Sequence, residues 1–261
     1  MAKKRKSIGR SLLEADDLDP VEVVNGNNAS LLLTCEHAGR SVPRALESLQ
    51  LPREEFDRHI AYDIGAAGLA KRLAQRLDAS LVLQRYSRLV IDCNRPIDAP
   101  DSITTVSDGT HISVNADLDY EERQQRVTEI HDPYHRAIAE RLDAHEGVPI
   151  LVSIHSFTPS MNNEERPWHA GLLFNRDDRL AKYMMPLLGK DDINVAYNEP
   201  YSVDDHSDYT IPVHGEVRGI PHVLIEVRDD QLENSAAQHQ WAEHIGVALE
   251  AALQVFDVSI R

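Results

Sequence analysis

The chain has 261 residues, which is enough for one large α/β domain or two small ones. Its apolar content of 42% and charged content of 27% are ordinary for a globular protein. The formal net charge of −16 argues against a nucleic-acid partner and against an anionic membrane surface. A small anionic substrate is not excluded, because a local basic pocket can form in an acidic protein.

The cysteines and the first residues of the chain bear on the cellular compartment that we expect for the protein. Cys35 and Cys93 both lie in apolar runs, so a disulfide framework is not expected and a reducing compartment fits. The basic residues 1–6 precede no apolar segment of the kind found in secretory signals, and no run reaches the ~18 apolar residues of a membrane span. We therefore expect a cytoplasmic protein with a mobile arm over residues 1–20 and a single domain over residues 21–261.

Short apolar runs alternate with helical patterns along the chain. Strands are predicted over residues 20–24, 31–34, 80–83, 88–93, 150–154, 171–175, 195–197 and 223–226. Helices are predicted over residues 52–60, 63–77, 120–145, 178–188 and 232–255. Asp63 is a natural cap for the second of these helices. The alternation predicts a three-layer α/β fold, with a mixed, mostly parallel sheet and helices on both faces.

Three of the predicted core strands end on side chains that can bind a metal. One ends on Glu36 and His37, one on His155 and one on Glu226. Ligands bind at the carboxyl edge of the strands in open α/β sheets, so we expect these side chains to meet there. A catalytic zinc ion takes three nitrogen or oxygen ligands and leaves a position for water. His37, Asp63 and His155 can supply two imidazoles and a carboxylate.

The chemistry expected of such a site is metal-assisted amide hydrolysis. The metal would lower the pKa of water to about 7 and polarise a carbonyl. Glu226 would then pass a proton from that water to the leaving nitrogen, and His214 could polarise a carbonyl or donate to an oxyanion. Each residue also has a structural interpretation, since Glu226 could pair with Arg228 or Arg218, and His214 could be an ordinary loop histidine.

Other reaction types are disfavoured by the sequence. Ser153 and Ser156 flank His155, but no Gly-x-Ser-x-Gly elbow is present. Neither cysteine has an activating neighbour, and Glu36 would raise a thiol pKa rather than lower it. No glycine-rich phosphate loop occurs.

A substrate carboxylate requires a rigid cation. Arg95 follows Asn94 at the end of a predicted strand that also contains Arg88. A guanidinium there can bind a carboxylate through two parallel hydrogen bonds. Exposed arginines without such a role are the alternative interpretation.

Seven short motifs, in consistent order between about residues 30 and 255, resemble the N-formylglutamate amidohydrolase family. They are Thr34-Cys-Glu-His-Ala-Gly39, Tyr62-Asp-Ile-Gly65, Val90-Ile-Asp-Cys-Asn-Arg-Pro96, Ser153-Ile-His-Ser-Phe-Thr158, Asn198-Glu-Pro-Tyr-Ser202, His214 with Arg218-Gly219, and Ile225-Glu-Val-Arg-Asp-Asp230. The resemblance implies a fold of the zinc carboxypeptidase or phosphorylase/hydrolase type, shared with zinc-dependent cell-wall amidases. In those amidases the ligands and the late glutamate follow the same order, but the second ligand is Glu, and Glu36 is therefore an alternative to Asp63.

The implied reaction is hydrolysis of N-formyl-L-glutamate to L-glutamate and formate, the last step of one histidine-degradation route. The implied cofactor is Zn²⁺ or another divalent cation, and the implied partner is a small anionic substrate. The residues expected to bind that substrate are Arg95, Asn94, Arg88, Ser156, Asn198, Arg218 and Arg228. Two alternatives remain, a related amidase or deacylase with another N-acyl or peptidoglycan-type substrate, and a non-catalytic ligand-binding member of the fold.

Overall fold

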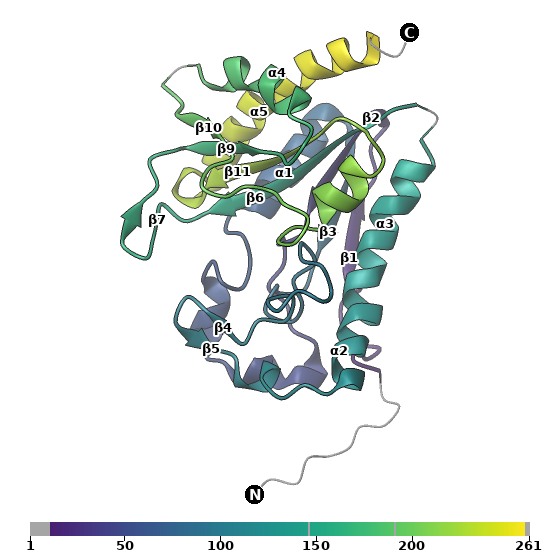
Figure 1. Cartoon of the computed structure of the whole chain (residues 1–261), viewed down its shortest axis with the longest axis vertical. Coiled ribbons are helices and arrows are strands. Elements are labelled where there is room, and N and C mark those ends of the chain that lie inside the picture. Colours follow the sequence, from purple (N-terminus) through teal and green to yellow (C-terminus); the bar gives the residue numbers. More distant parts are fainter. Residues whose placement is uncertain (1–10, 146, 191, 259–261) are drawn as a thin grey trace, which may run out of the picture.

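The computed structural model describes residues 11–145, 147–190 and 192–258. Seven strands of this part form the central sheet (Figure 1). They are β1 (Val21–Val24), β2 (Asn28–Cys35), β3 (Ala79–Gln84), β6 (Ile150–Phe157), β9 (Ala170–Leu173), β10 (Val195–Tyr197) and β11 (His222–Arg228). Two small hairpins lie outside the sheet, formed by β4 (Val106–Ser107) with β5 (Thr110–His111) and by β7 (Ser160–Met161) with β8 (Glu164–Glu165).

The sheet is mixed and mostly parallel, as predicted. Its strand order is β1-β3-β2-β6-β11-β9-β10. The three central strands β2, β6 and β11 are parallel neighbours, whereas β1 pairs antiparallel with β3 and β9 antiparallel with β11. The carboxyl ends of β2, β6 and β11 therefore lie side by side at one edge.

Helices cover both faces of the sheet, which confirms the predicted layers (Figure 1). They are α1 (Ala66–Leu77), α2 (Tyr120–Arg126), α3 (Asp132–Asp143), α4 (Arg179–Leu188) and α5 (Ser235–Val258). Short 3₁₀ turns span Arg44–Gln50, Arg53–Asp57, Ser113–Asn115 and Asp229–Gln231, and π turns span Val127–His131 and Ile211–Glu216. No helix of the described part is both long and apolar enough to cross a bilayer.

The period of two along a strand assigns side chains to the two faces. In β6, Val152 and Ile154 pack with α1, α4 and α5, whereas Leu151 packs on the opposite face with α3. Ser153 and His155 alternate with the first pair, so they lie on the α3 face. In β11, Leu224 packs on the α3 face. Glu226 follows it by two residues, so the Glu226 side chain points to the same face. The site residues thus emerge where the α3 side of the sheet is not filled by apolar packing.

The segment 88–93 is not a strand, contrary to prediction. Leu89 is buried, but its neighbour Val90 donates its backbone N–H to Ser87 in a turn at 2.9 Å. The Val90 carbonyl accepts from the buried Arg126 at 2.8 Å. A buried apolar run can therefore have its backbone hydrogen bonds satisfied by side chains and turns rather than by a sheet. Hydrophobic periodicity does not distinguish this case from a core strand.

Three helix predictions also need correction. The residue that caps α1 is Gly65, in a left-handed conformation with φ 81°, and the Asp63 carboxylate is turned toward the histidines instead. The helix expected over 52–60 is a 3₁₀ turn, Arg53–Asp57. The helix expected over 120–145 consists of α2, a π turn and α3.

The expected mobile arm is only partly within the described residues, because residues 1–10 lie outside them. Residues 11–20 differ from the expectation. Leu12 is buried, and the backbone N–H groups of Leu12 and Leu13 donate to the Glu129 carboxylate at 2.9 and 2.8 Å. This stretch therefore packs against the π turn that precedes α3.

Arg126 provides a test of how the 88–93 turn is held. Its Nη1 also donates to Asn115 Oδ1 at 2.8 Å, so Arg126→Met leaves two buried acceptors without a partner. We expect the free energy of unfolding to fall by about 2–4 kcal/mol, because buried hydrogen bonds to charged groups are costly to lose. Urea denaturation measures this change. Arg136→Met, on the exposed side of α3, is the control and should change stability by less than about 0.5 kcal/mol; equal effects of both variants would contradict the prediction.

Candidate metal centre

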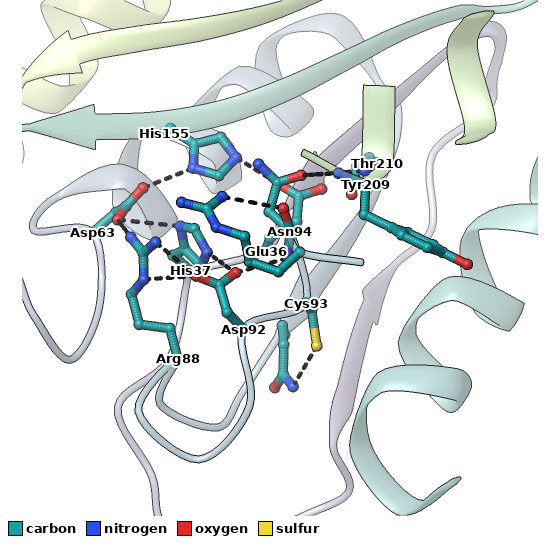
Figure 2. Close-up of polar contacts among 12 residues, drawn as sticks. Glu36, His37, Asp63, Arg88, Asp92, Cys93, Asn94, His155, Tyr209 and Thr210 are labelled. Carbon is teal, nitrogen blue, oxygen red and sulfur yellow. Dashed lines mark hydrogen bonds and ion pairs between the residues drawn. The ribbon is translucent and has the colours of Figure 1, made fainter. Parts of the chain in front are cut away.

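His37, Asp63 and His155 converge at the carboxyl edge of the sheet (Figure 2). His37 follows β2, His155 lies in β6, and Asp63 lies in the turn that leads into α1. Asp63 Oδ2 is 2.9 Å from His155 Nδ1, and Asp63 Oδ1 is 3.4 Å from His37 Nδ1. One donor atom from each of the three buried residues lies within 4.8 Å of the others. The structure thus brings together the three residues that the sequence predicted as metal ligands.

Each imidazole is held from its other side by a second carboxylate. His37 Nε2 is 2.7 Å from Asp92 Oδ1, and His155 Nε2 is 2.7 Å from Glu36 Oε2. Metal-binding histidines characteristically donate their outer ring N–H to a carboxylate, which sets the tautomer and aims the inner nitrogen at the metal. Both inner nitrogens here are Nδ1, and both face Asp63.

Glu36 lies outside the group of ligand atoms. Its Oε2 accepts from Ser153 Oγ at 2.6 Å as well as contacting His155 Nε2, and its Oε1 accepts from Tyr134 Oη at 3.2 Å. Glu36 therefore orients His155 from behind, and Asp63 is the carboxylate placed between the two imidazoles.

Asp92 was missed as a site residue by the sequence analysis. The available signal was its position in the motif 90–96, where an acid ends an apolar run. The run was interpreted as a sheet strand, which gave no reason to turn its acid toward His37.

The charges of this buried cluster are unbalanced. Burial alone would raise the pKa of the Glu36, Asp63 and Asp92 carboxyls, but neighbouring groups hold all three pKa values below their ordinary range. The partners are His155 for Glu36, His37 for Asp63 and Arg88 for Asp92. Burial lowers the pKa of the His155 imidazole, yet its bonds to Asp63 and Glu36 raise this pKa well above its usual value.

Three ionised carboxylates thus face one imidazolium and one guanidinium. The buried His37 Nδ1 also makes no hydrogen bond. A divalent cation between His37, Asp63 and His155 would complete the charge balance and use the free nitrogen. The donor set, two imidazole nitrogens and a carboxylate, is the set found in catalytic zinc sites. The residues present therefore fit a divalent metal ion.

Glu226 lies beside this cluster without being part of it. In the parallel pairing of β11 with β6, Glu226 is directly opposite His155. Its side chain is buried and Oε2 has no hydrogen-bond partner, and burial raises the pKa of its carboxyl to about 7. A carboxyl with this pKa, facing a cavity, is suited to carry protons at neutral pH.

A cavity of about 710 Å³ opens over the cluster and Glu226. Four residues expected to bind substrate are in its wall, and these are Arg88, Asn94, Arg95 and Ser156. Arg88 is bonded to Asp92 Oδ2 through Nε and Nη2, at 3.1 and 2.7 Å. Ser156 Oγ donates to the Ile64 carbonyl at 2.8 Å, which ties β6 to the turn before α1.

Arg95 and Asn94 face loops that lie across the cavity. Arg95 Nε donates to Asp101 at 2.9 Å, and Nη1 donates to the Ser207 carbonyl. Asn94 Oδ1 accepts the backbone amides of residues 209 and 210, each at 3.2 Å. Both side chains therefore position loop backbone, and Nη2 of Arg95 makes no hydrogen bond to any residue described in the structure.

His214 is not among the residues of the cavity wall as described, and its carbonyl-polarising role stays a prediction. It lies in a π turn, buried, with Nε2 3.0 Å from His135 Nδ1 and Nδ1 3.5 Å from Arg218 Nη1. Burial and the charge of Arg218 lower the pKa of His214 to about 4. His214 is therefore neutral, and its ring nitrogens contact other side chains that hold the π turn in place.

Three other residues expected to bind substrate are likewise absent from the cavity wall as described. Arg218 pairs with Asp143 at 2.9 Å, and Arg228 donates to Asp230 at 2.8 Å. Asn198 Oδ1 accepts the backbone N–H that follows β9 at 2.9 Å. Each of these side chains is explained by local structure.

Comparison with known proteins identifies the family. Residues 29–232 match the family model described as N-formylglutamate amidohydrolase. N-formylglutamate deformylase from Pseudomonas aeruginosa is 35% identical over 96 residues, which are 32% of this chain and 36% of that protein. The match thus spans about a third of that relative's length.

Solved structures share the fold of this chain. A gene product of Agrobacterium tumefaciens has 32% sequence identity and a TM-score of 0.90, over 94% of this chain and 99% of the other. An N-formylglutamate amidohydrolase from Ralstonia eutropha shares the fold, with a TM-score of 0.64 and 16% identity over 93% of this chain and 100% of that chain. The chain belongs to the N-formylglutamate amidohydrolase family, whose name denotes hydrolysis of a carbon–nitrogen bond other than a peptide bond.

Proposed function

We propose that the protein is a metal-dependent hydrolase that cleaves the amide bond of a small N-acyl amino acid. The observation that carries the proposal is the His37–Asp63–His155 group, braced by carboxylates, beside Glu226 in one cavity. Family membership supports amide hydrolysis and makes N-formyl-L-glutamate the reference substrate, with L-glutamate and formate as products and histidine degradation as the pathway. Zinc is the proposed metal.

The side chains of the site would hold the metal ion and transfer the protons. His37, Asp63 and His155 would hold the ion, which when bound provides a Lewis acid for water and for the acyl carbonyl. Glu226 accepts a proton from the attacking water and delivers it to the leaving nitrogen. A metal ion held beside Glu226 would lower the pKa of this carboxyl from about 7 and so favour its ionised, basic form.

The α-carboxylate of the substrate is assigned to Arg95. Arg88 is engaged by Asp92 through two nitrogens, and its Nη1 is 3.4 Å from Asp63 Oδ1. Arg95 lines the cavity, and the bonds described for it use Nε and Nη1, which leaves Nη2 for a ligand. Of the two, Arg95 is therefore the guanidinium with capacity for a ligand.

Formate release tests the proposed reaction. Zinc-loaded protein should release formate and free amine from N-formyl amino acids, because the site combines a metal-binding group with a base. A chelator should abolish the release, and added zinc should restore it. Absence of turnover across the series would contradict the proposal. Turnover that persists after a chelator has removed the metal would contradict it as well.

Glu226→Gln separates catalysis from metal binding. The amide keeps the size of the side chain but cannot take a proton. Turnover should fall by about 10²–10⁴-fold, the usual contribution of general acid–base catalysis, with the zinc content unchanged. Glu233→Gln, which alters an exposed acid, is the control and should keep normal activity. Near-normal turnover of Glu226→Gln would reassign Glu226 to a structural role.

Arg95→Lys tests carboxylate binding. Lysine lacks the planar fork, so kcat/KM for substrates with a free α-carboxylate should fall by about 5–150-fold, equivalent to roughly 1–3 kcal/mol. The same substrates as α-methyl esters should be almost unaffected. Steady-state kinetics on matched acid and ester pairs make the comparison. An equal loss for both forms would assign Arg95 to holding the loops through Asp101 and Ser207.

A further inference from the structure

Arg166 is a cation that adjoins the cavity and has no part in the proposed chemistry. It follows the β7–β8 hairpin, whose first strand lies beyond the carboxyl end of β6 (Figure 1). Its backbone N–H donates to the Pro159 carbonyl at 2.8 Å, and its carbonyl accepts from Arg228 Nη1 at 2.9 Å. The half-buried Arg166 side chain therefore extends from a fixed backbone.

Uncharged residues of the cavity wall hold the Arg166 guanidinium. Its central carbon lies 4.8 Å from the centre of the Tyr201 ring and 6.0 Å from that of Phe157. Its Nη1 donates to Thr158 Oγ1 at 3.3 Å, and its Nη2 is 3.2 Å from Met161 Sδ. These four partners all line the cavity, so Arg166 lies next to the cavity without being part of its wall as described.

The charge of Arg166 is not balanced by a carboxylate among the residues that the structure describes. The bonds found for its guanidinium go to a carbonyl, a hydroxyl and a thioether, and all three acceptors are neutral. Glu164 and Glu165, which precede it, are exposed and form no ion pair with it. Stacking on an aromatic ring uses the face of the guanidinium, whereas its N–H groups lie in the plane. Arg166 is therefore held in place and keeps N–H donors for an anion.

The part of the cavity wall next to Arg166 carries no negative charge. Residues 156–161 and 200–202 contribute only uncharged side chains to the wall. Arg95 belongs to a different segment of the wall and is already paired with Asp101 at 2.9 Å. A carboxylate placed near Arg166 would thus be attracted by its charge and would meet no acid in the adjoining wall.

We infer, resting on the proposed function, that Arg166 binds the side-chain carboxylate of an N-acyl acidic amino acid and so selects this class of substrate. The acyl group lies at the metal-binding residues and the α-carboxylate at Arg95. The substrate side chain extends past Phe157 and Tyr201 to Arg166, whose planar fork binds its carboxylate through two parallel hydrogen bonds. An uncharged side chain gives Arg166 no such partner and is bound less tightly.

Arg166→Gln tests this role on zinc-loaded protein, with N-formyl-L-glutamate and its uncharged isostere N-formyl-L-glutamine as substrates. The unmodified protein should favour the glutamate derivative by at least about tenfold in kcat/KM. In Arg166→Gln this value should fall by about 10–100-fold for the glutamate derivative, the range for a lost hydrogen bond to a charged group. Retained kcat/KM for the glutamine derivative shows that the variant folds. Arg53→Gln, exposed and outside the wall, is the control and should leave both values unchanged.

Two substitutions of Tyr201 test how Arg166 is positioned. Tyr201→Leu removes the aromatic face, so the glutamate-to-glutamine ratio of kcat/KM should fall by about 2–5-fold, the scale of an exposed cation–π contact. Tyr201→Phe keeps the ring and should keep the ratio. An unchanged ratio in Tyr201→Leu would contradict the role given to this contact.

The outcomes separate this inference from the proposed function. An equal loss for both substrates in Arg166→Gln would assign Arg166 to holding the hairpin and would overturn the inference. The absence of a preference for glutamate in the unmodified protein would also overturn it. Both results leave the proposed function standing, because amide hydrolysis is still observed. Hydrolysis of neither substrate, nor of any other N-formyl amino acid, would overturn the proposed function and the inference with it.

Discussion

His155 is held between two buried carboxylates, and the arrangement of the site depends on this contact. Asp63 and Glu36 lie 2.9 and 2.7 Å from its two ring nitrogens. Burying charges is costly unless each has a partner, so the geometry must keep these groups together. His37 repeats the pattern between Asp63 and Asp92. Asp63 is thus shared by both imidazoles, and excess negative charge is concentrated where a divalent cation would be bound by all three residues.

The sheet determines where this cluster can form. Parallel neighbours β2, β6 and β11 end together, and their period of two sends Ser153, His155 and Glu226 to the same face. On that face the turn segment 88–93, held by Arg126, brings Arg88 and Asp92 to the cluster. The opposite face is filled by apolar packing with α1, α4 and α5. One face is therefore filled by apolar packing, whereas the α3 face combines a second apolar core with the site.

The three metal-binding residues were predictable from the sequence, whereas Asp92 and the surroundings of His214 were not. His155 and Glu226 follow from apolar runs that end on polar groups, because strand direction and register are set by local pattern. Asp92 was missed because a buried turn and a buried strand share the same apolar composition. The surroundings of His214 could not be predicted, because they depend on tertiary contacts with His135 and Arg218 that a loop position in the sequence does not reveal.

Calorimetric titration of metal-free protein with zinc at pH 7, in buffers of different ionisation enthalpy, tests the metal centre most directly. Because Asp63 and Glu36 raise the His155 pKa, this imidazole is protonated before metal binding and must lose its proton to become a ligand. The account predicts one zinc per chain, with release of about one proton that is lost in His155→Ala together with tight binding. Absence of zinc binding would contradict the account. Zinc binding that releases no proton and remains tight in His155→Ala would contradict it as well.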